Sequence, residues 1–591
     1  MIKRKNIFSI VGAVIAVLSS CLIYIYRGVL IERTVDTVIM IVVTLSLTYF
    51  YIFSFQSGWK YGLGTGFKIG FGAIVFLSYW MFWGYGLSRI LSRYGLFTVV
   101  AVGLIMLVWQ IWMTLTALNF IELLRNKISK IHKTSVSNKT AFLIIFLIMM
   151  AGALTATRVF YPGVISSDNM AIYTQALAGE RSDIHSFALI LLVKLLTLLS
   201  DNYYIITLFF AISFSLAWAN MMMTLYSYGF PLILCGVVSV VFIFVPTNFI
   251  LFAATWKDIP FCICMLLLTT SIIKMVFEDF HLAVRDVVLL IVGLTGSALF
   301  RSNGQVVLIV CSIVFLIIWA RKRHKNLIIT VLVSVGVLIL FKGPVFYLLD
   351  VDRGGDWFTS IPFLDGVWEN IHAGNELDEE TKNYIEDLMP IERFEYAYAE
   401  SYYNISAVKA YGNSNKISLN KSIKAYLKCL QNYPGTTLKA RAKKTFNLWS
   451  VFPSDKYLVN YNLAADISQT VSRYGFDWKY PPQYESMRMM LMLSLRDDLN
   501  VYLLFIRGSH ALAMSLLLGL YFAGKGKKSF ILIILPAVVN QIALIAACCF
   551  LDYRYTWPMF VMTIPFVCTA FINKGAKDTG SISAESAGNG I

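Results

Sequence analysis

Charged residues are scarce in this chain of 591 amino acids. Only 14% of the residues are Asp, Glu, Lys or Arg, whereas roughly 25% is usual for globular domains. Hydrophobic residues make up 58% of the chain, and the mean hydropathy is +0.68. This composition excludes a soluble globular protein. Because lipid offers the backbone no hydrogen-bond partner, the apolar segments predict an all-α polytopic membrane protein.

Cysteine and histidine are also too sparse in the polar parts of the chain to build a disulfide framework or a metal site. Of the nine cysteines, only Cys429 lies outside the apolar segments, so the polar region around it cannot contain an internal disulfide. The six histidines are scattered along the chain without the spacing of metal ligands. Nothing in these residue types requires a metal.

Apolar segments of about 17 to 25 residues, each long enough to cross roughly 30 Å of hydrocarbon, recur along the chain. We expect about 14 transmembrane helices, near residues 7–26, 35–54, 69–92, 96–120, 141–158, 204–226, 231–252, 259–277, 286–301, 305–320, 326–347, 507–523, 529–550 and 555–573. Segment 183–200 is short and contains Lys194. We expect it to be re-entrant or to lie along the membrane interface, without crossing.

The charge is unevenly distributed. Window 350–498 holds 20 acidic and 17 basic residues, whereas the rest of the chain carries a net charge of +19. Basic clusters in short loops mark the cytoplasmic ends of membrane helices, and such an excess is better explained by anionic lipid than by nucleic acid. We expect a multi-pass protein of the cell membrane, with both termini in the cytoplasm and residues 350–505 outside.

These patterns divide the chain into five parts. They are a four-helix membrane module at 1–124, a membrane core at 125–349 with a first outer loop at 159–184, an extracytoplasmic soluble domain at 350–505, C-terminal membrane helices at 506–574 and a disordered tail at 575–591. The soluble domain, of about 155 residues, is long enough for its own core. Its aromatic residues between Trp449 and Tyr484 predict irregular loops, which either pack on one another or stack on a sugar.

One polar loop stands out between the apolar segments. It contains Asp168 shortly after an apolar segment, with Gly163 and Ser166-Ser167 giving a tight turn. A carboxylate at the edge of a membrane is costly, which favours a functional role. Asp168 could act as a general base that takes a proton from an acceptor hydroxyl. The alternative, an N-cap for a helix at 170–178, fits the sequence equally well.

Three further polar islands lie between apolar segments. In the first, Lys257 could bind a phosphate, and Asp258 could orient it or cap the following helix. In the second, Arg301 offers a bidentate phosphate ligand, and Asn303-Gly304 predicts a tight turn with free backbone N–H groups. The third is Arg554-Tyr555, which places another basic side chain at the start of a predicted helix. A local ion pair is the structural alternative for the first island.

If segment 183–200 does not cross the membrane, these four loops lie on the same, outer side. They would then form a phosphate-binding site next to the carboxylate of Asp168. His185 adjoins the short segment and is a further candidate, although a lone histidine is more often a satisfied interfacial residue.

At these residues the sequence resembles the GT-C superfamily of integral-membrane glycosyltransferases. It is similar to bacterial members with the motifs Pro-Gly, Asp-Ser, Gln, Trp-His-Pro, Trp-Lys-Asp, Phe-Arg-x-Asn-Gly and Arg-Tyr. The corresponding residues are Pro162-Gly163, Asp168, Gln175, His185, Trp256-Lys257-Asp258, Phe300-Arg301-Ser302-Asn303-Gly304 and Arg554-Tyr555. The chain departs from the pattern at Asn169, where Ser is usual, and at Ile184 and Ser186, where Trp and Pro are usual.

The resemblance implies a GT-C-like fold, a catalytic base at Asp168, and a sugar donor linked to polyprenyl phosphate. The acceptor would be a cell-surface glycan or polymer, reached outside the membrane with inversion at the sugar. The implied substrate- and phosphate-binding residues are Gln175, His185, Lys257, Asp258, Arg301, Asn303, Arg554 and Tyr555. Some relatives use a divalent cation in the first outer loop, but with Asn169 beside Asp168 none is required here.

Two other functions would use parts of the same pattern. A transporter or flippase of lipid-linked envelope precursors would need the phosphate site but not Asp168. A non-catalytic assembly protein would use its outer domain to bind wall polymer. Transporters tend to contain internal repeats, and the sequence shows none. The polar groups at one face of the membrane favour the enzyme.

Overall fold

Helices are the regular elements of the part of the chain that the structure describes. The computed structural model describes residues 72–81 and 100–131 in part, and then residues 136–394, 408, 412–450, 467–493, 508–548 and 553–572. The predicted helices at 7–26 and 35–54 and the predicted tail at 575–591 lie outside these ranges. Within the ranges there are isolated β-bridges but no strands.

Six described helices are long and apolar enough to cross a membrane. They are α4 (Asn138–Val159), α7 (Tyr204–Ser227), α10 (Asp258–Phe277), α12 (Ser302–Lys322), the continuous stretch of α13 (Lys325–Leu340), η1 (Phe341–Val345) and α14 (Phe346–Leu348), and the pair η6 (Lys528–Phe530) and α25 (Ile531–Ala547). The prediction of an all-α protein with membrane-spanning helices is confirmed for the described chain.

A seventh span would be formed by two helices with a sharp bend between them. The axes of α8 (Leu232–Phe244) and α9 (Pro246–Phe252) differ in direction by 83°. The fully buried Asn248 donates from Nδ2 to the Phe242 carbonyl (2.9 Å) and accepts at Oδ1 from Trp557 Nε1 (2.8 Å). The side chain thus provides partners for polar groups that the break would otherwise leave unpaired in the membrane.

Three more apolar helices of the described chain pack in the bundle, and a fourth is shorter than a membrane span. α11 (Val284–Phe300), α24 (Gly508–Gly524) and α26 (Tyr553–Ala570) pack among the longer helices. α6 (Phe187–Thr197) has 11 residues, or about 16 Å at 1.5 Å per residue. This is about half the hydrocarbon thickness, in agreement with the expectation that segment 183–200 is too short to cross.

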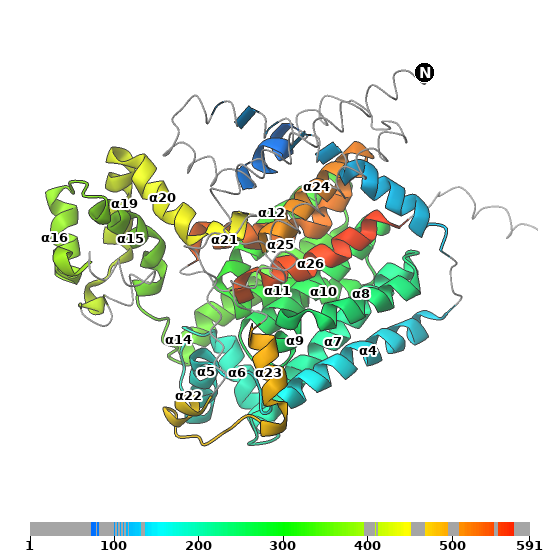
Figure 1. Ribbon diagram of the computed structural model, residues 1–591, viewed down its shortest axis with the longest axis horizontal. Coiled ribbons are helices and arrows are strands. Elements are labelled where there is room, and N and C mark those ends of the chain that lie inside the picture. Colours follow the sequence, from blue (N-terminus) through cyan, green and yellow to red (C-terminus); the bar gives the residue numbers. More distant parts are fainter. Residues whose placement is uncertain are drawn as a thin grey trace, which may run out of the picture.

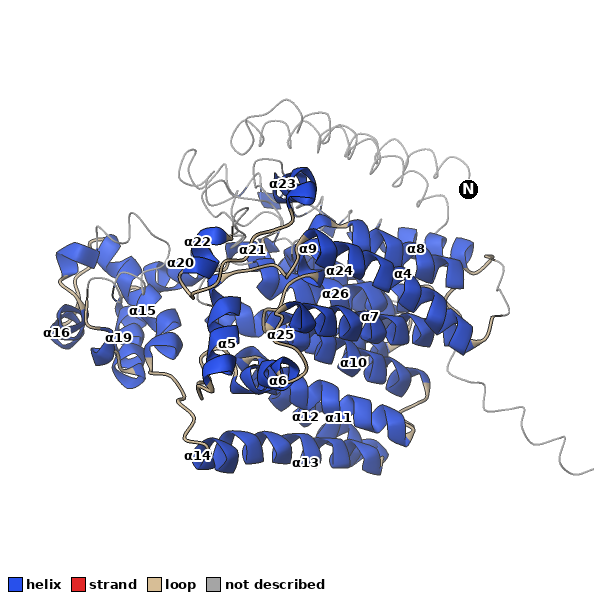
Figure 2. Ribbon diagram, turned by 90° about the horizontal axis from the view of Figure 1, so that it is seen from below, coloured by secondary structure: helices blue, strands red, loops and turns tan. Residues whose placement is uncertain are grey.

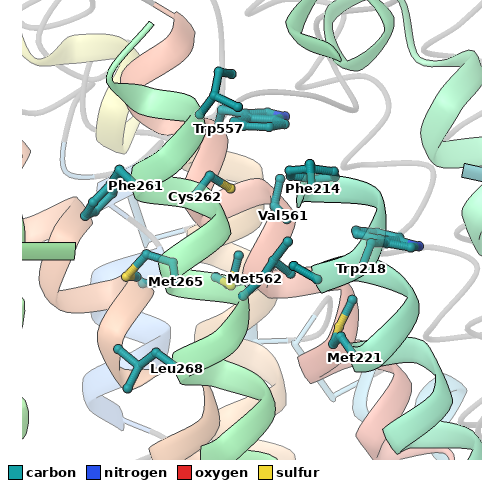
Figure 3. Close-up of a cluster of buried hydrophobic side chains, with 14 of the residues drawn as sticks. Phe214, Trp218, Met221, Phe261, Cys262, Met265, Leu268, Trp557, Val561 and Met562 are labelled. Atoms are coloured by element: carbon teal, nitrogen blue, oxygen red, sulfur yellow. The ribbon is translucent and has the colours of Figure 1, made fainter. Parts of the chain in front are cut away.

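Helices α7, α10 and α26 meet at the centre of the bundle. Figure 3 shows Phe214 and Trp218 of α7, Phe261 and Met265 of α10, and Met562 of α26 in one cluster, and all five are buried. α10 also packs closely on α11, because a Cβ at Gly293 would lie 2.6 Å from the Leu268 backbone nitrogen. Small residues allow such close approach between membrane helices. α13 lies at the edge of the bundle (Figure 2), with only 17% of its span buried.

The predicted extracytoplasmic segment contributes to two packing units. α15 (Trp357–His372), α16 (Glu379–Leu388), η2 (Ser414–Lys416), α19 (Leu419–Asn432) and α20 (Pro434–Lys444) form a helical lobe beside the bundle (Figure 1) with its own core. Residues 467–493, with α22 (Ser468–Ser472), η3 (Pro482–Tyr484) and α23 (Glu485–Leu493), instead pack on the core of the bundle.

The lobe is attached to the bundle at the end of α25. Arg441 of α20 donates from Nε to the Ile545 carbonyl (2.9 Å) and from Nη2 to the Cys548 carbonyl (2.5 Å). It thereby pairs with carbonyls that have no partner inside α25. Just beyond α20, Leu448 of α21 (Phe446–Trp449) packs against Leu544 and Cys548. These contacts join the lobe to the C-terminal end of α25.

Candidate active site

The 159–184 loop leads from α4 towards α6 and contains α5 (Ser167–Ala178). Helices α5 and α6 lie together at one end of the bundle (Figure 1). The Val164 N–H donates to the Ala253 carbonyl (2.7 Å), and the Thr207 hydroxyl donates to the Pro162 carbonyl (2.8 Å). A Cβ at Gly163 would lie 2.5 Å from the Thr207 hydroxyl oxygen. A larger residue at this position would therefore displace the loop.

Helix α5 begins with Ser166 as its N-cap. The Ser166 hydroxyl oxygen accepts from the Asn169 N–H (3.4 Å) and from Trp256 Nε1 (2.7 Å). The alternative prediction that Asp168 caps this helix is therefore wrong, because Asp168 lies in the first turn. Asn169 Nδ2 donates to the Val164 carbonyl (2.7 Å), so this departure from the GT-C motif stabilises the shape of the loop.

Asp258, the first residue of α10, lies fully buried between two arginines. Its carboxylate forms an ion pair with Arg301 Nη1 and lies 3.9 Å from Arg554 Nε. The side chains of Arg301 and Arg554 are only 8% and 4% exposed. Buried charges need opposite charges close by, so Asp258 holds both guanidinium groups in one place. The predicted cap at Asp258 is wrong, because Lys257 occupies the N-cap position of α10.

Aromatic rings pack against both guanidinium groups. Arg301 Cζ lies 4.6 Å from the ring centre of Tyr555 and 5.9 Å from that of Phe261. Arg554 Cζ lies 5.1 Å from the ring centre of Trp256 and 5.3 Å from that of Tyr555. Tyr555 thus contacts both arginines. Cation–π contacts of this kind fix the planes of the two groups and exclude water from their faces.

Asp168 joins the cluster through Arg554. Its Oδ2 accepts from Arg554 Nη2 at 2.8 Å, and its side chain remains 34% exposed. Burial raises the pKa of Asp168, but the nearby Arg554, His185 and Lys257 outweigh this effect and hold the pKa below its usual value. The carboxylate is therefore ionised but weakly basic while it is paired with Arg554.

The charges of the cluster leave a net positive site. Lys257, Arg301 and Arg554 contribute three positive charges, and Asp168 and Asp258 contribute two negative ones. The sum is +1 before any charge on His185. A phosphate diester, which carries one negative charge, would balance it. The arrangement can therefore bind a phosphate next to a partly exposed carboxylate.

Asn303 supports Arg301 from within α12. Arg301 Nε donates to Asn303 Oδ1 (3.0 Å), and Asn303 Nδ2 donates to Asn540 Oδ1. The predicted tight turn at Asn303-Gly304 is wrong, because the chain turns at Arg301, whose backbone is extended, and α12 begins at the next residue. The Gly304 N–H donates to the Arg301 carbonyl (3.1 Å). A Cβ at Gly304 would collide with the Ser297 carbonyl, so this position favours glycine.

His185 and Gln175 occupy different places relative to the cluster. His185 is close enough for its charge to act on Asp168. The next residue, Ser186, has a φ of 75° and donates from its hydroxyl to the Leu299 carbonyl (2.9 Å), near the end of α11. Gln175 lies seven residues, or about two helical turns, beyond Asp168 on the same face of α5. Its amide oxygen is buried without a hydrogen-bond partner.

Residues 474–488 cover the 159–184 loop, a contact that the sequence did not predict. The Tyr480 hydroxyl accepts from the Ile165 N–H (3.2 Å), and Arg488 Nη1 donates to the Val159 carbonyl (3.1 Å). The ring centre of Trp478 lies 5.8 Å from that of Tyr173 in α5. These aromatic side chains pack on the loop as well as on one another. The partners are about 300 residues apart in sequence, so no local pattern indicates the contact.

Acidic and metal-ligating side chains do not form a cluster in the described ranges. No group of three or more His, Cys, Asp or Glu side chains that could hold a metal occurs there. Asp168 and Asp258 both pair with arginine. A contribution from a divalent cation stays a prediction of the family resemblance.

Comparison with protein-family models, with curated proteins and with solved structures finds no match for this chain. The resemblance to the GT-C superfamily therefore rests on the motif residues alone. The convergence of these residues does not depend on that resemblance. It comes from ion pairs and ring contacts between distant segments, including one pair separated by 386 residues.

The first prediction concerns the side of the membrane on which the site lies. Cysteines introduced at the exposed Ser167 and Ser302 should both react from outside with an impermeant thiol reagent, whereas one at the exposed Lys322 should not. The native cysteines of the described ranges are buried, so replacing Cys21 and Cys549 by Ser should leave little background. If Ser167→Cys and Ser302→Cys react from opposite sides of the membrane, the two loops cannot belong to one site.

Proposed function

We propose that the protein is a membrane glycosyltransferase that moves a sugar from a polyprenyl-phosphate donor to a cell-surface acceptor. The acceptor would be a glycan, a teichoic-acid-like polymer or a lipid-linked glycan outside the cell membrane. In this proposal about 14 helices cross the membrane, both termini are cytoplasmic, and the site and residues 350–505 lie outside. The motif resemblance and the geometry of the charged cluster support the proposal.

One observation carries it: two nearly buried arginines share one buried carboxylate, and a second, partly exposed carboxylate pairs with one of them. Asp258 pairs with both Arg301 and Arg554, whereas the partly exposed Asp168 accepts a hydrogen bond from Arg554. An arginine pair is suited to the planar recognition of phosphate. A carboxylate beside it is suited to proton transfer.

Donor binding would change the partner of Arg554. A donor phosphate entering the cluster would share Arg554 and weaken its ion pair with Asp168. The cation that lowers the pKa of Asp168 would then be partly neutralised, so the pKa would rise and the carboxylate would become a stronger base. Asp258 would keep the two guanidinium groups together during this exchange, because it is fully buried.

The reaction then follows from these positions. The acceptor hydroxyl gives its proton to Asp168, and its oxygen attacks the anomeric carbon of the donor sugar. The bond from this carbon to the phosphate oxygen breaks, and the electron pair leaves with polyprenyl phosphate. Arg301, Arg554 and Lys257 stabilise the second negative charge that develops on that phosphate. Attack from the face opposite the leaving group inverts the sugar.

The transporter alternative gains one observation, the 83° bend between α8 and α9, since transporters often bind substrate at broken helices. Here the polar side chain at the bend already has partners within the protein, because Asn248 is hydrogen-bonded to both the Phe242 carbonyl and the Trp557 indole. The charged groups instead lie at the N-terminal ends of α10, α12 and α26. This distribution favours the enzyme.

The second prediction tests the function in cells. Mass spectrometry of surface polymers from cells with and without the gene should show a sugar substituent that disappears in its absence. A copy carrying Arg301→Ala should fail to restore the substituent, because the donor phosphate loses a main ligand. An Asp387→Asn copy changes an exposed ion pair of the lobe and serves as the control that should restore it. Identical polymers in the two strains would refute the proposed function.

A further inference from the structure

Asn540 is an unusual residue for its position in the fold. It lies within the apolar span of α25 and is fully buried. A polar side chain at such a place is costly unless it is used. Its Oδ1 accepts from Asn303 Nδ2, and Asn303 in turn accepts from Arg301 Nε. Asn540 therefore belongs to the hydrogen-bonded chain that holds the phosphate-binding cluster.

The donor–acceptor order of these two hydrogen bonds is determined by Arg301. A guanidinium Nε–H can only donate, so the atom of Asn303 that faces Arg301 must be its oxygen. The amide nitrogen of Asn303 must then point to Asn540, and the atom of Asn540 that receives it must be the oxygen. The amide group of Asn540 is therefore oriented with its Nδ2 away from Asn303.

Asn540 Nδ2 has no hydrogen-bond partner although it is buried. Leaving a buried donor unpaired is unfavourable, and buried polar groups in native proteins nearly always have a partner. The neighbouring Gln541 differs, because its Nε2 donates to the Leu448 carbonyl (2.8 Å) on the side of the lobe. In α25 the unpaired buried amide donor thus belongs to the residue that is linked to Arg301 through Asn303.

We propose that Asn540 is a further ligand-binding residue, whose amide Nδ2 donates to an oxygen of the lipid-linked phosphate. The inference rests on the proposed function, because it assigns a further ligand to the same phosphate. The phosphate would receive planar, charged donors from Arg301 and Arg554 and a neutral donor from Asn540. A neutral donor adds a hydrogen bond without changing the net charge of the site.

The third prediction uses direct binding of a synthetic polyprenyl monophosphate to the purified full-length protein in nanodiscs. Asn540→Asp keeps an oxygen for Asn303 but replaces the donor by a carboxylate oxygen. Binding should weaken about 10- to 100-fold, the loss expected for a hydrogen bond to a charged group. Gln541→Glu introduces a carboxylate one residue away on the same helix. It is the matched control and should weaken binding by less.

Three further measurements complete the test. Polyprenol of the same chain length lacks the phosphate and should bind equally to all variants. If Asn540→Asp shows no cooperative thermal unfolding, Asn540→Leu replaces it, and a similar loss of phosphate binding supports the inference. Parental affinity in either folded variant, with weakened binding in Arg301→Ala, would overturn this inference alone. If the parental protein does not prefer the phosphate over polyprenol, both the inference and the proposed function fail.

Discussion

Asp168→Asn should reduce sugar transfer to near background, by about 10² to 10⁴ in rate, the usual contribution of a general base. Asn has almost the same size and cannot take the acceptor proton. The fold should tolerate the change, because Ser166 caps α5 and the Asp168 side chain is 34% exposed. Transfer by the purified protein, measured together with its melting temperature, tests this.

The same variant should not lose affinity for polyprenyl monophosphate. Asp168 competes with the phosphate for Arg554, and its removal raises the net charge of the cluster from +1 to +2. Binding should therefore stay equal or become tighter while transfer is lost. Ser167→Ala, at the exposed neighbouring position, is the control and should transfer at the parental rate. Parental transfer by Asp168→Asn would rule out this residue as the base.

Asp258→Asn should destabilise the protein more than any other single change in the cluster. Removing one partner of a buried ion pair costs about 3–5 kcal/mol, because the remaining charge is left uncompensated. Here Arg301 and Arg554, only 8% and 4% exposed, would lose the carboxylate that they share. We expect a clearly lower melting temperature in detergent and weaker phosphate binding, since the two guanidinium groups would no longer be held together.

The control for this change is Asp279→Asn. Asp279 pairs with Lys322, and its side chain is 68% exposed, so its loss should cost only about 0–1 kcal/mol. Addition of polyprenyl monophosphate should restore part of the stability of Asp258→Asn, because the ligand supplies the missing negative charge to the arginines. If Asp258→Asn melts at the same temperature as Asp279→Asn, the carboxylate does not organise the cluster.

The helices of the bundle could be predicted from the sequence because lipid permits few alternatives. Apolar length alone indicated the positions of α4, α7 and α10, and the shortness of segment 183–200 agrees with the 11 residues of α6. The bend between α8 and α9 was missed, because segment 231–252 is long and apolar enough on average to be read as one span. Its cause is a proline together with a buried asparagine whose partners lie in other parts of the chain.

The structure brings the predicted charged residues together, but it differs from their predicted local roles. Asp168 and Asp258 were each given a helix cap as an alternative, yet both form ion pairs with arginines from distant segments. The N-cap of α5 is Ser166. Ser and Asp are both favoured at this position, so the sequence did not decide between Ser166, Ser167 and Asp168. Asn540 was missed, although an asparagine within an apolar segment is itself a signal of function.

The most direct test of the account is a single reaction with purified components. Liposomes containing the protein receive polyprenyl-phosphate-linked sugars and cell-surface acceptor extracted from the same cells, and the lipids are followed by mass spectrometry. We predict release of polyprenyl monophosphate in step with addition of the sugar to the acceptor, and neither product with Asp168→Asn. If the sugar-linked lipid instead crosses the bilayer intact, at equal rates with the parental protein and Asp168→Asn, the protein is a transporter and the account is wrong.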